Sequence, residues 1–261
     1  MATFRRRPES EAATHEGAAE RQELFNRIAP VYDKLNDVFS LGMHKLWKRW
    51  SISWSGAKEG DKALDVCCGS GDLSFLLSQK VGVNGKVIAL DFSKEQLQVA
   101  ASRQRERSKS NPCYKNIEWF EGDAVNLPFP DSTFDAATIG YGLRNVIDRK
   151  KALEQMHRVL KPGAKLSVLD FNKSTSQYIC TIQLVWTYKR VPIPEELNQG
   201  YLTGAFVSAQ ITYIYAVSIL PNLSSNKTGA ELEKLALEVG FSDAKHYEIA
   251  GGLMGNFVAK R

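Results

Sequence analysis

Cysteine and histidine are scarce in this chain, and neither forms a metal-binding pattern. Only four cysteines and four histidines occur among the 261 residues. Cys67 and Cys68 are neighbours, Cys113 and Cys180 stand alone, and the paired Cys-x-x-Cys spacing of a zinc site is missing. We therefore expect no metal site and no disulfide framework, with free thiols of the kind that a reducing compartment preserves.

The sequence also lacks a concentrated basic block and a good membrane span. Its net charge of +5 is mild and spread along the chain, which argues against a nucleic-acid partner. The uncharged stretch from Leu197 to Asn226 is long enough to cross a bilayer, but its glycines, Gln210 and Pro221 make a poor transmembrane helix. A buried or lid-forming segment beside an apolar pocket is the better interpretation.

Three regions follow from the pattern of the chain. The predicted regions are a disordered tail (1–22), a helical arm (23–60) and a main domain (61–261) that carries an atypical lid or insert at 174–227. The tail mixes arginines with several acids, and neither a secretory signal nor an acid-poor transit peptide is evident in it. Within the arm, Ser40 is the expected cap of a helix over 41–50.

The main domain is organised around a glycine turn between a strand and a helix. Lys62–Val66 is an apolar run typical of a buried strand, the chain breaks at Gly69 and Gly71, and a helix is expected from Asp72. Glycines let the backbone approach a ligand closely, and the next helix presents unpaired N–H groups there. The pattern favours a nucleotide-like cofactor.

The turn departs from the dinucleotide fingerprint. Gly-x-Gly-x-x-Gly requires a third glycine where this chain has Ser74, and Asp65 stands four residues before the first glycine. A carboxylate beside the turn suits a cationic or hydroxyl-bearing ligand better than a pyrophosphate. A glycine turn of some other α/β protein is the alternative.

Further strands and helices alternate along the chain. We expect strands at 86–91, 117–120, 134–140 and 165–171, helices at 94–109, 148–160 and 228–239, a turn at 161–163, and a terminal hairpin of 244–249 with 253–259. Five strands alternating with helices predict a parallel, doubly wound sheet, which binds ligands outside the carboxyl ends of its strands.

The candidate cofactor-binding residues all fall at that edge of the predicted sheet. They are Asp65, Gly69, Ser70, Gly71, Asp91, Phe92, Asp123, Ala124 and Gly140. Asp91 ends the second strand about twenty residues after the glycines, where nucleoside-binding folds place a carboxylate for the ribose hydroxyls. The alternative role of Asp91 is a helix cap, which Ser93 serves better. Asp123 is the candidate acceptor for an adenine amino group.

Several stretches together resemble known families. Asp65-x-x-Cys68-Gly69-Ser70-Gly71-Asp72 resembles motif I of class I S-adenosylmethionine-dependent methyltransferases. Tyr32–Trp47, Gly122–Phe129 with Gly142–Val146, and Arg158–Gly163 resemble signatures of the ubiquinone/menaquinone biosynthesis C-methyltransferases. This resemblance implies S-adenosylmethionine as cofactor. It also implies an α/β, Rossmann-like, doubly wound fold with a mostly parallel seven-stranded sheet and an N-terminal helical arm.

Finer features are similar to the plant chloroplast branch of that family. They are Cys67–Asp72, Ser53–Lys58 and Gly251–Asn256. The branch converts demethylphylloquinol to phylloquinol in vitamin K1 synthesis, so the resemblance implies a prenylated naphthoquinol or benzoquinol substrate and a chloroplast location, with a cytoplasmic location as the alternative. It also implies a peripheral membrane contact, and a homodimer is an open alternative.

The resemblance implies roles for a second group of residues. Arg144 and Asn145 are the candidates for the quinol hydroxyl, with Arg144 as an electrostatic stabiliser and Tyr32 completing a hydrogen-bond relay. His44, Trp47 and Tyr141 are the candidate wall of the ring pocket. For His44, packing or capping is the stronger alternative.

Other functions remain open from the sequence. Residues 174–227 depart from the family pattern, as do Ala164, Asp170 and Asn172 in the second signature. A catalytically impaired, cofactor-binding paralogue or isoform is therefore one alternative, and an RNA or protein methyltransferase is another. Asn111–Tyr114 superficially resembles an amino-methylating motif, but it precedes the third strand whereas that motif follows the fourth.

Overall fold

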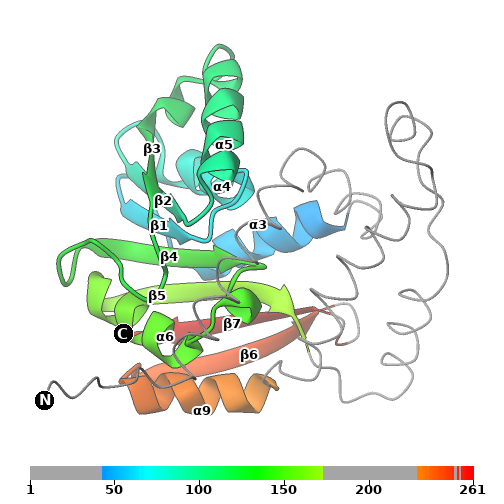
Figure 1. Ribbon diagram of the computed structural model, residues 1–261, viewed down its shortest axis with the longest axis vertical. Helices are drawn as coiled ribbons and strands as arrows, with labels where there is room; N and C mark the ends of the chain where they lie inside the picture. The colour runs from blue at the N-terminus through cyan, green and yellow to red at the C-terminus, as the bar shows by residue number, and fades with distance from the viewer. Residues whose placement is uncertain (1–42, 173–227, 250–251, 253) are drawn as a thin grey trace, which may run out of the picture.

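The computed structural model describes residues 43–172, 228–249, 252 and 254–261 (Figure 1). The predicted tail, most of the helical arm with Tyr32 and Ser40, and the whole of the predicted lid at 174–227 lie outside the described residues.

Seven strands form one sheet in the order β3-β2-β1-β4-β5-β7-β6. Their bounds are β1 Lys62–Val66, β2 Lys86–Asp91, β3 Ile117–Glu121, β4 Phe134–Gly140, β5 Leu160–Phe171, β6 Asp243–Ile249 and β7 Met254–Lys260. Strands β1 to β5 are parallel, and only β7 runs antiparallel to its neighbours β5 and β6. The predicted seven-stranded, mostly parallel sheet is confirmed. Its order reverses at β1 and β4, which makes a switch point there.

Helices cover both faces of this sheet (Figure 1). They are α3 His44–Trp54, α4 Asp72–Val81, α5 Lys94–Arg107, α6 Arg149–Val159 and α9 Gly229–Val239, with short 3₁₀ turns η1 Pro112–Asn116 and η2 Leu143–Asn145. One apolar core joins the sheet to α6 and α9, and a second joins it to α3, α4 and α5. As predicted, Ser93 caps α5, where its Oγ accepts the Gln96 N–H at 3.2 Å.

Helix α3 differs from the helix expected over 41–50. Its N-cap is Met43, which makes no side-chain cap, and the helix continues to Trp54. The continuation packs on the C-terminal part of the sheet. Ser51 Oγ lies 3.0 Å from Ser167 Oγ, and Trp54 stacks on Tyr247 with ring centroids 5.1 Å apart. These long-range contacts extend the helix beyond the end that the sequence suggested.

The turn predicted at 161–163 lies inside β5, which begins at Leu160, and the strand is irregular there: Gly163 has φ 82°, and the pairing with β4 shifts register between Leu160 and Lys165. Gly163 N–H donates to the carbonyl of Arg261 at 2.8 Å, and Arg261 N–H donates to the carbonyl of Ala164 at 2.9 Å. The last residue of the chain therefore hydrogen-bonds to both sides of this irregular stretch. A Pro-Gly pair that looks like a turn locally is paired by a segment about a hundred residues away.

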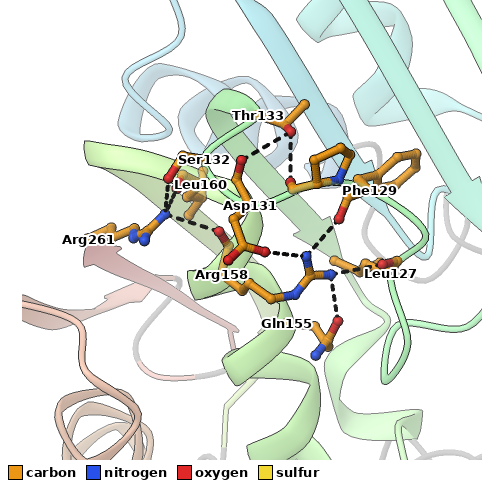
Figure 2. Close-up of polar contacts among 10 residues, drawn as sticks. Leu127, Phe129, Asp131, Ser132, Thr133, Gln155, Arg158, Leu160 and Arg261 are labelled. Carbon is orange, nitrogen blue, oxygen red and sulfur yellow. Dashed lines mark hydrogen bonds and ion pairs between the residues drawn. The ribbon is translucent and has the colours of Figure 1, made fainter.

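Two arginines stabilise the end of the sheet at which β4 and β5 begin, which we call the amino edge (Figure 2). The guanidinium of Arg158 donates to the carbonyls of Leu127 at 2.9 Å and Phe129 at 2.7 Å, and it pairs with Asp131 at 2.8 Å. The guanidinium of Arg261 donates to Ser132 Oγ at 2.9 Å and to the carbonyls of Arg158 and Leu160. This edge is closed by hydrogen bonds to the backbone.

Among the residues that the structure describes, no helix combines the length and the apolar character that crossing a membrane requires. The same residues contain no cluster of His, Cys, Asp or Glu side chains arranged to hold a metal ion. Cys67, Cys68 and Cys113 are free thiols.

Candidate functional site

A cavity of about 380 Å³ opens at the carboxyl ends of β1, β2 and β4. Its volume is in the range of small-molecule sites. The predicted residues that line it are Asp65, Gly69, Ser70, Asp91, Phe92, Asp123, Ala124, Gly140, Tyr141 and Asn145. The topology thus brings together residues that are far apart in the sequence.

The glycine turn has a backbone that only glycine adopts easily. Gly69 has φ 52° and Gly71 has φ 93°. A Cβ added to Gly71 would lie 2.6 Å from Cη2 of Trp119. Gly71 is not among the residues that line the cavity, so this glycine lets the turn pack against Trp119.

Asp91 links the glycine turn to the start of α5. One carboxylate oxygen accepts the Gly69 N–H at 2.8 Å, and the other accepts the Ser93 N–H at 2.9 Å. Burial raises the pKa of Asp91, although these backbone hydrogen bonds act to lower it. Each carboxylate oxygen has a second lone pair, so the group is able to accept ligand hydroxyls while it holds the turn.

Asp65 lies fully buried beneath the turn. Its carboxylate accepts hydrogen bonds from Ser74 Oγ at 2.6 Å and from Thr138 Oγ1 at 2.9 Å. Burial raises its pKa to about 7, against the lowering effect of these two hydroxyls. The acid therefore ties β1 to α4 and β4, and it supports the turn from below while reaching the cavity wall.

The loop after β3 supplies Asp123 and Ala124 to the far side of the cavity. Asp123 Oδ1 accepts the Val125 N–H at 3.1 Å. Gly122 N–H donates to the carbonyl of Asp91 at 3.0 Å, which places this loop beside the end of β2. The two acids predicted for the ribose and the adenine thus follow neighbouring strands.

Arg144 follows β4, where its side chain is buried beside β5. Its Nη1 donates to Asp170 Oδ1 at 2.6 Å and to the carbonyl of Tyr141 at 2.6 Å. Arg144 does not line the large cavity, whereas its neighbour Asn145 does. The buried guanidinium therefore forms an ion pair with a carboxylate on β5, and the role of Arg144 as an electrostatic stabiliser stays a prediction.

Of the three predicted ring-pocket residues, only Tyr141 lines the cavity. Tyr141 lines the cavity with φ 58°, a strained value for a residue other than glycine. Trp47 is packed in a buried cluster with Tyr141 and Leu169. His44 is also buried, and neither residue lines the cavity. Tyr32 lies outside the described residues.

Lys48 and Gln96 are among the residues of the cavity wall that were not predicted from the sequence. Lys48 is only 6% exposed and donates to Asp72 Oδ2 at 2.6 Å. Nothing in the sequence connects α3 to a residue 24 positions later. Gln96 is also buried, and its Oε1 has no hydrogen-bond partner in the described part of the chain. In a capping box, the Gln96 side chain would accept a hydrogen bond from the Ser93 N–H, but here Asp91 accepts that hydrogen bond instead.

Comparisons with known proteins show the family of the chain. The profile of the ubiE/COQ5 methyltransferase family matches residues 13–261. The chain is 56% identical over 242 residues, 93% of its length, to the "2-phytyl-1,4-beta-naphthoquinone methyltransferase, chloroplastic" of Arabidopsis thaliana, and covers 87% of that protein. It is 44% identical over 243 residues to the "2-phytyl-1,4-naphtoquinone methyltransferase" of Nostoc punctiforme, with 93% of this chain and 98% of that protein covered.

A solved structure supports the fold. A SAM-dependent methyltransferase from Aquifex aeolicus superposes with a TM-score of 0.58 at 22% identity, covering 87% of this chain and 97% of that one.

Proposed function

Because this chain belongs to the ubiE/COQ5 methyltransferase family, we propose that it methylates a ring carbon of 2-phytyl-1,4-naphthoquinol. The protein is an S-adenosylmethionine-dependent methyltransferase with the class I fold. The observation that carries the choice of substrate is the 56% identity, over 93% of the chain, to the Arabidopsis relative with that substrate in its name.

The cavity residues fit this cofactor. S-adenosylmethionine, when bound, supplies an electrophilic methyl group on a sulfonium. We assign Asp91 to the ribose hydroxyls, because its carboxylate lines the cavity at the end of β2. We assign Asp123 to the adenine amino group, and the glycine turn to the backbone contacts of the methionine end. Asp65 then has a supporting role, since both of its oxygens already accept hydrogen bonds from hydroxyls.

The chain's own residues must favour the ionised quinol. A phenolic hydroxyl titrates near ~10, and its ionised form delocalises charge onto the adjacent ring carbon, which becomes the nucleophile. Asn145 lines the cavity just after β4 and is our candidate for the contact with this hydroxyl. Tyr32 stays a prediction for the relay.

Arg144 fits a positioning role better than a direct one. Its guanidinium holds the carbonyl of Tyr141 at 2.6 Å, and Asn145 Nδ2 donates to the same carbonyl at 3.3 Å. Arg144 therefore fixes the segment that carries Tyr141 and Asn145. Trp47, packed behind Tyr141, supports the same wall from α3. Holding the two reactants in contact in a water-poor cavity is expected to supply most of the rate.

The substrate carries a long apolar chain, so the protein must meet a membrane surface. Helix α3 exposes Met43 (44%), Leu46 (38%) and Trp50 (40%) at the spacing of one helical face. Lys45 and Arg49 lie exposed next to them. Apolar and aromatic side chains flanked by basic ones are typical of a reversible interfacial contact. We place the protein in the chloroplast, in line with the name of the Arabidopsis relative; a homodimer stays a prediction.

The test is methyl transfer from radiolabelled S-adenosylmethionine to 2-phytyl-1,4-naphthoquinone, supplied once chemically reduced and once oxidised. Label in the lipid with the reduced form alone is the expected result, and a prenylated benzoquinol tested in parallel reports ring specificity. Cofactor binding without label in any quinol would favour the impaired paralogue. Label in RNA or protein instead would overturn the quinol assignment.

A further inference from the structure

Two cations share one carboxylate beside the glycine turn. Asp72, the first residue of α4, accepts Lys48 Nζ on one oxygen and Arg103 Nη2 on the other, both at 2.6 Å. Burial acts to raise the pKa of Asp72, but the charges and hydrogen bonds of Lys48 and Arg103 outweigh it and hold that pKa well below its usual range. The three side chains therefore carry a net charge of +1.

Within this group, Lys48 is the cation that faces the cavity. Lys48 and Asp72 line it, whereas Arg103 turns to Ser70 and donates to its carbonyl at 2.9 Å and its Oγ at 2.7 Å. Lys48 Nζ also lies 5.7 Å from the ring centroid of Tyr141. Lys48 thus stands between the turn after β1 and the residue after β4.

The position of Lys48 corresponds to one end of the cofactor. With the adenosine half at Asp91 and Asp123, over β2 and β3, the methionine half must extend toward β1 and β4. That half carries a carboxylate, whose charge-assisted hydrogen bonds prefer a cationic donor. Among the described residues that line the cavity, the cationic side chains are Lys48 and Lys151, and Lys151 comes from α6.

We propose that Lys48 binds the α-carboxylate of S-adenosylmethionine. Asp72 holds the Lys48 ammonium in position, and Arg103 leaves the three side chains with a net positive charge. This inference rests on the cofactor of the proposed function and is independent of the quinol. It gives the N-terminal arm a part in cofactor binding, because Lys48 is the one wall residue that α3 contributes.

The test compares two nucleosides by calorimetry, without quinol. S-adenosylhomocysteine carries the carboxylate, and its decarboxylated analogue keeps the amine but lacks the carboxylate. Lys48→Met should weaken the binding of S-adenosylhomocysteine about tenfold or more, which is the effect of losing one charge-assisted hydrogen bond. The same variant should leave the affinity for the decarboxylated analogue unchanged within about twofold. Lys48→Arg, which keeps the charge, should recover part of the loss.

Lys151→Met is the matched control, because it removes the other cavity-lining lysine and should not change the ratio of the two affinities. Equal weakening of both nucleosides by Lys48→Met would show that Lys48 only supports the fold and would overturn the proposal. Unchanged affinities for both nucleosides in Lys48→Met would show that Lys48 does not bind the carboxylate, which also overturns the proposal. Because no quinol is present in the binding experiment, a wrong substrate assignment would leave its result intact.

Discussion

The two edges of the sheet use polar side chains in opposite ways. At the amino edge, Arg158 and Arg261 donate to backbone carbonyls and close the ends of β4 and β5. At the carboxyl edge, Asp91 and Asp123 line a cavity, and burial raises the pKa of Asp91. The first edge holds the strands in place, and the second edge leaves room for a ligand.

Backbone strain is not what separates the edges. Among the described residues, the non-glycine residues with positive φ are Cys67 and Tyr141 at the carboxyl edge and Ser132 at the amino edge. What differs is the surroundings. Ser132 is exposed and its N–H donates to the carbonyl of Arg158 at 3.0 Å, whereas Cys67 and Tyr141 line the cavity. Strained backbone next to a cavity is the combination typical of a functional site.

Asp91→Ala, at the carboxyl edge, should have the largest effect on cofactor affinity. Losing a charged acceptor for ligand hydroxyls is worth up to about 3 kcal/mol, so the Kd for S-adenosylhomocysteine should rise about 100-fold. Calorimetry measures the Kd, and thermal unfolding without ligand reports the cost to the fold. Asp91→Asn keeps the shape and one acceptor but loses the charge and one of the two backbone hydrogen bonds, so its Kd should rise less than that of Asp91→Ala. Full cofactor affinity in Asp91→Ala would contradict the ribose assignment.

Arg158→Met should have the reverse effect. It removes donors to the carbonyls of Leu127 and Phe129 and the ion pair with Asp131. We expect the free energy of unfolding in urea to fall by about 2 kcal/mol. The cofactor Kd, measured well below the unfolding temperature, should stay within about twofold. A tenfold increase in the cofactor Kd would show that the amino edge is coupled to the site.

Asp65→Asn should change how stability depends on pH. The pKa of Asp65 is about 7 in the folded chain and 3.8 without burial, so between these values the folded state binds more protons than the unfolded state. Stability contributed by this group is therefore lost as the pH rises from about 4 to about 7, by up to about 1.4 kcal/mol per pH unit. The variant should lack this slope in urea titrations at several pH values. An unchanged slope would mean that Asp65 titrates normally.

Lys161→Met should have the smallest effect. Lys161 pairs with Asp135 at 2.6 Å at the amino edge, but 46% of its side chain is exposed. Exposed ion pairs contribute about 0.5 kcal/mol and are screened by salt. The urea midpoint should barely move, and less at high salt. A loss close to that of Arg158→Met would show that the amino edge depends on its exposed ion pairs as well as on its backbone contacts.

The sheet was predictable because its signals are local. Lys86–Asp91 and Phe134–Gly140 read as buried strands at their observed bounds, since short, mostly apolar runs mark strands covered on both faces. The start of β5 was missed because Lys161-Pro162-Gly163 has the composition of a turn. Its place in the strand depends on hydrogen bonds with Arg261, which no local pattern reveals.

The site was predictable only in its backbone positions. Asp91 and Asp123 line the cavity because they follow strands at the expected edge, and their roles stay predictions. The direction of Arg144 was missed because its partner Asp170 is 26 residues away on β5. Lys48 was missed for the same reason, since only the packing of α3 beside α4 brings it to Asp72. Position follows from sequence pattern, and side-chain direction follows from tertiary contacts.

The most direct measurement of the difference between the edges is amide hydrogen exchange with and without S-adenosylhomocysteine, at labelling times of seconds where local opening dominates. The account predicts new protection in peptides that cover the cavity wall, at 67–72, 91–96, 122–125 and 140–146, with little change at 127–133 and 158–164. Equal or greater protection in the amino-edge peptides would contradict the assignment of the cofactor to the carboxyl edge.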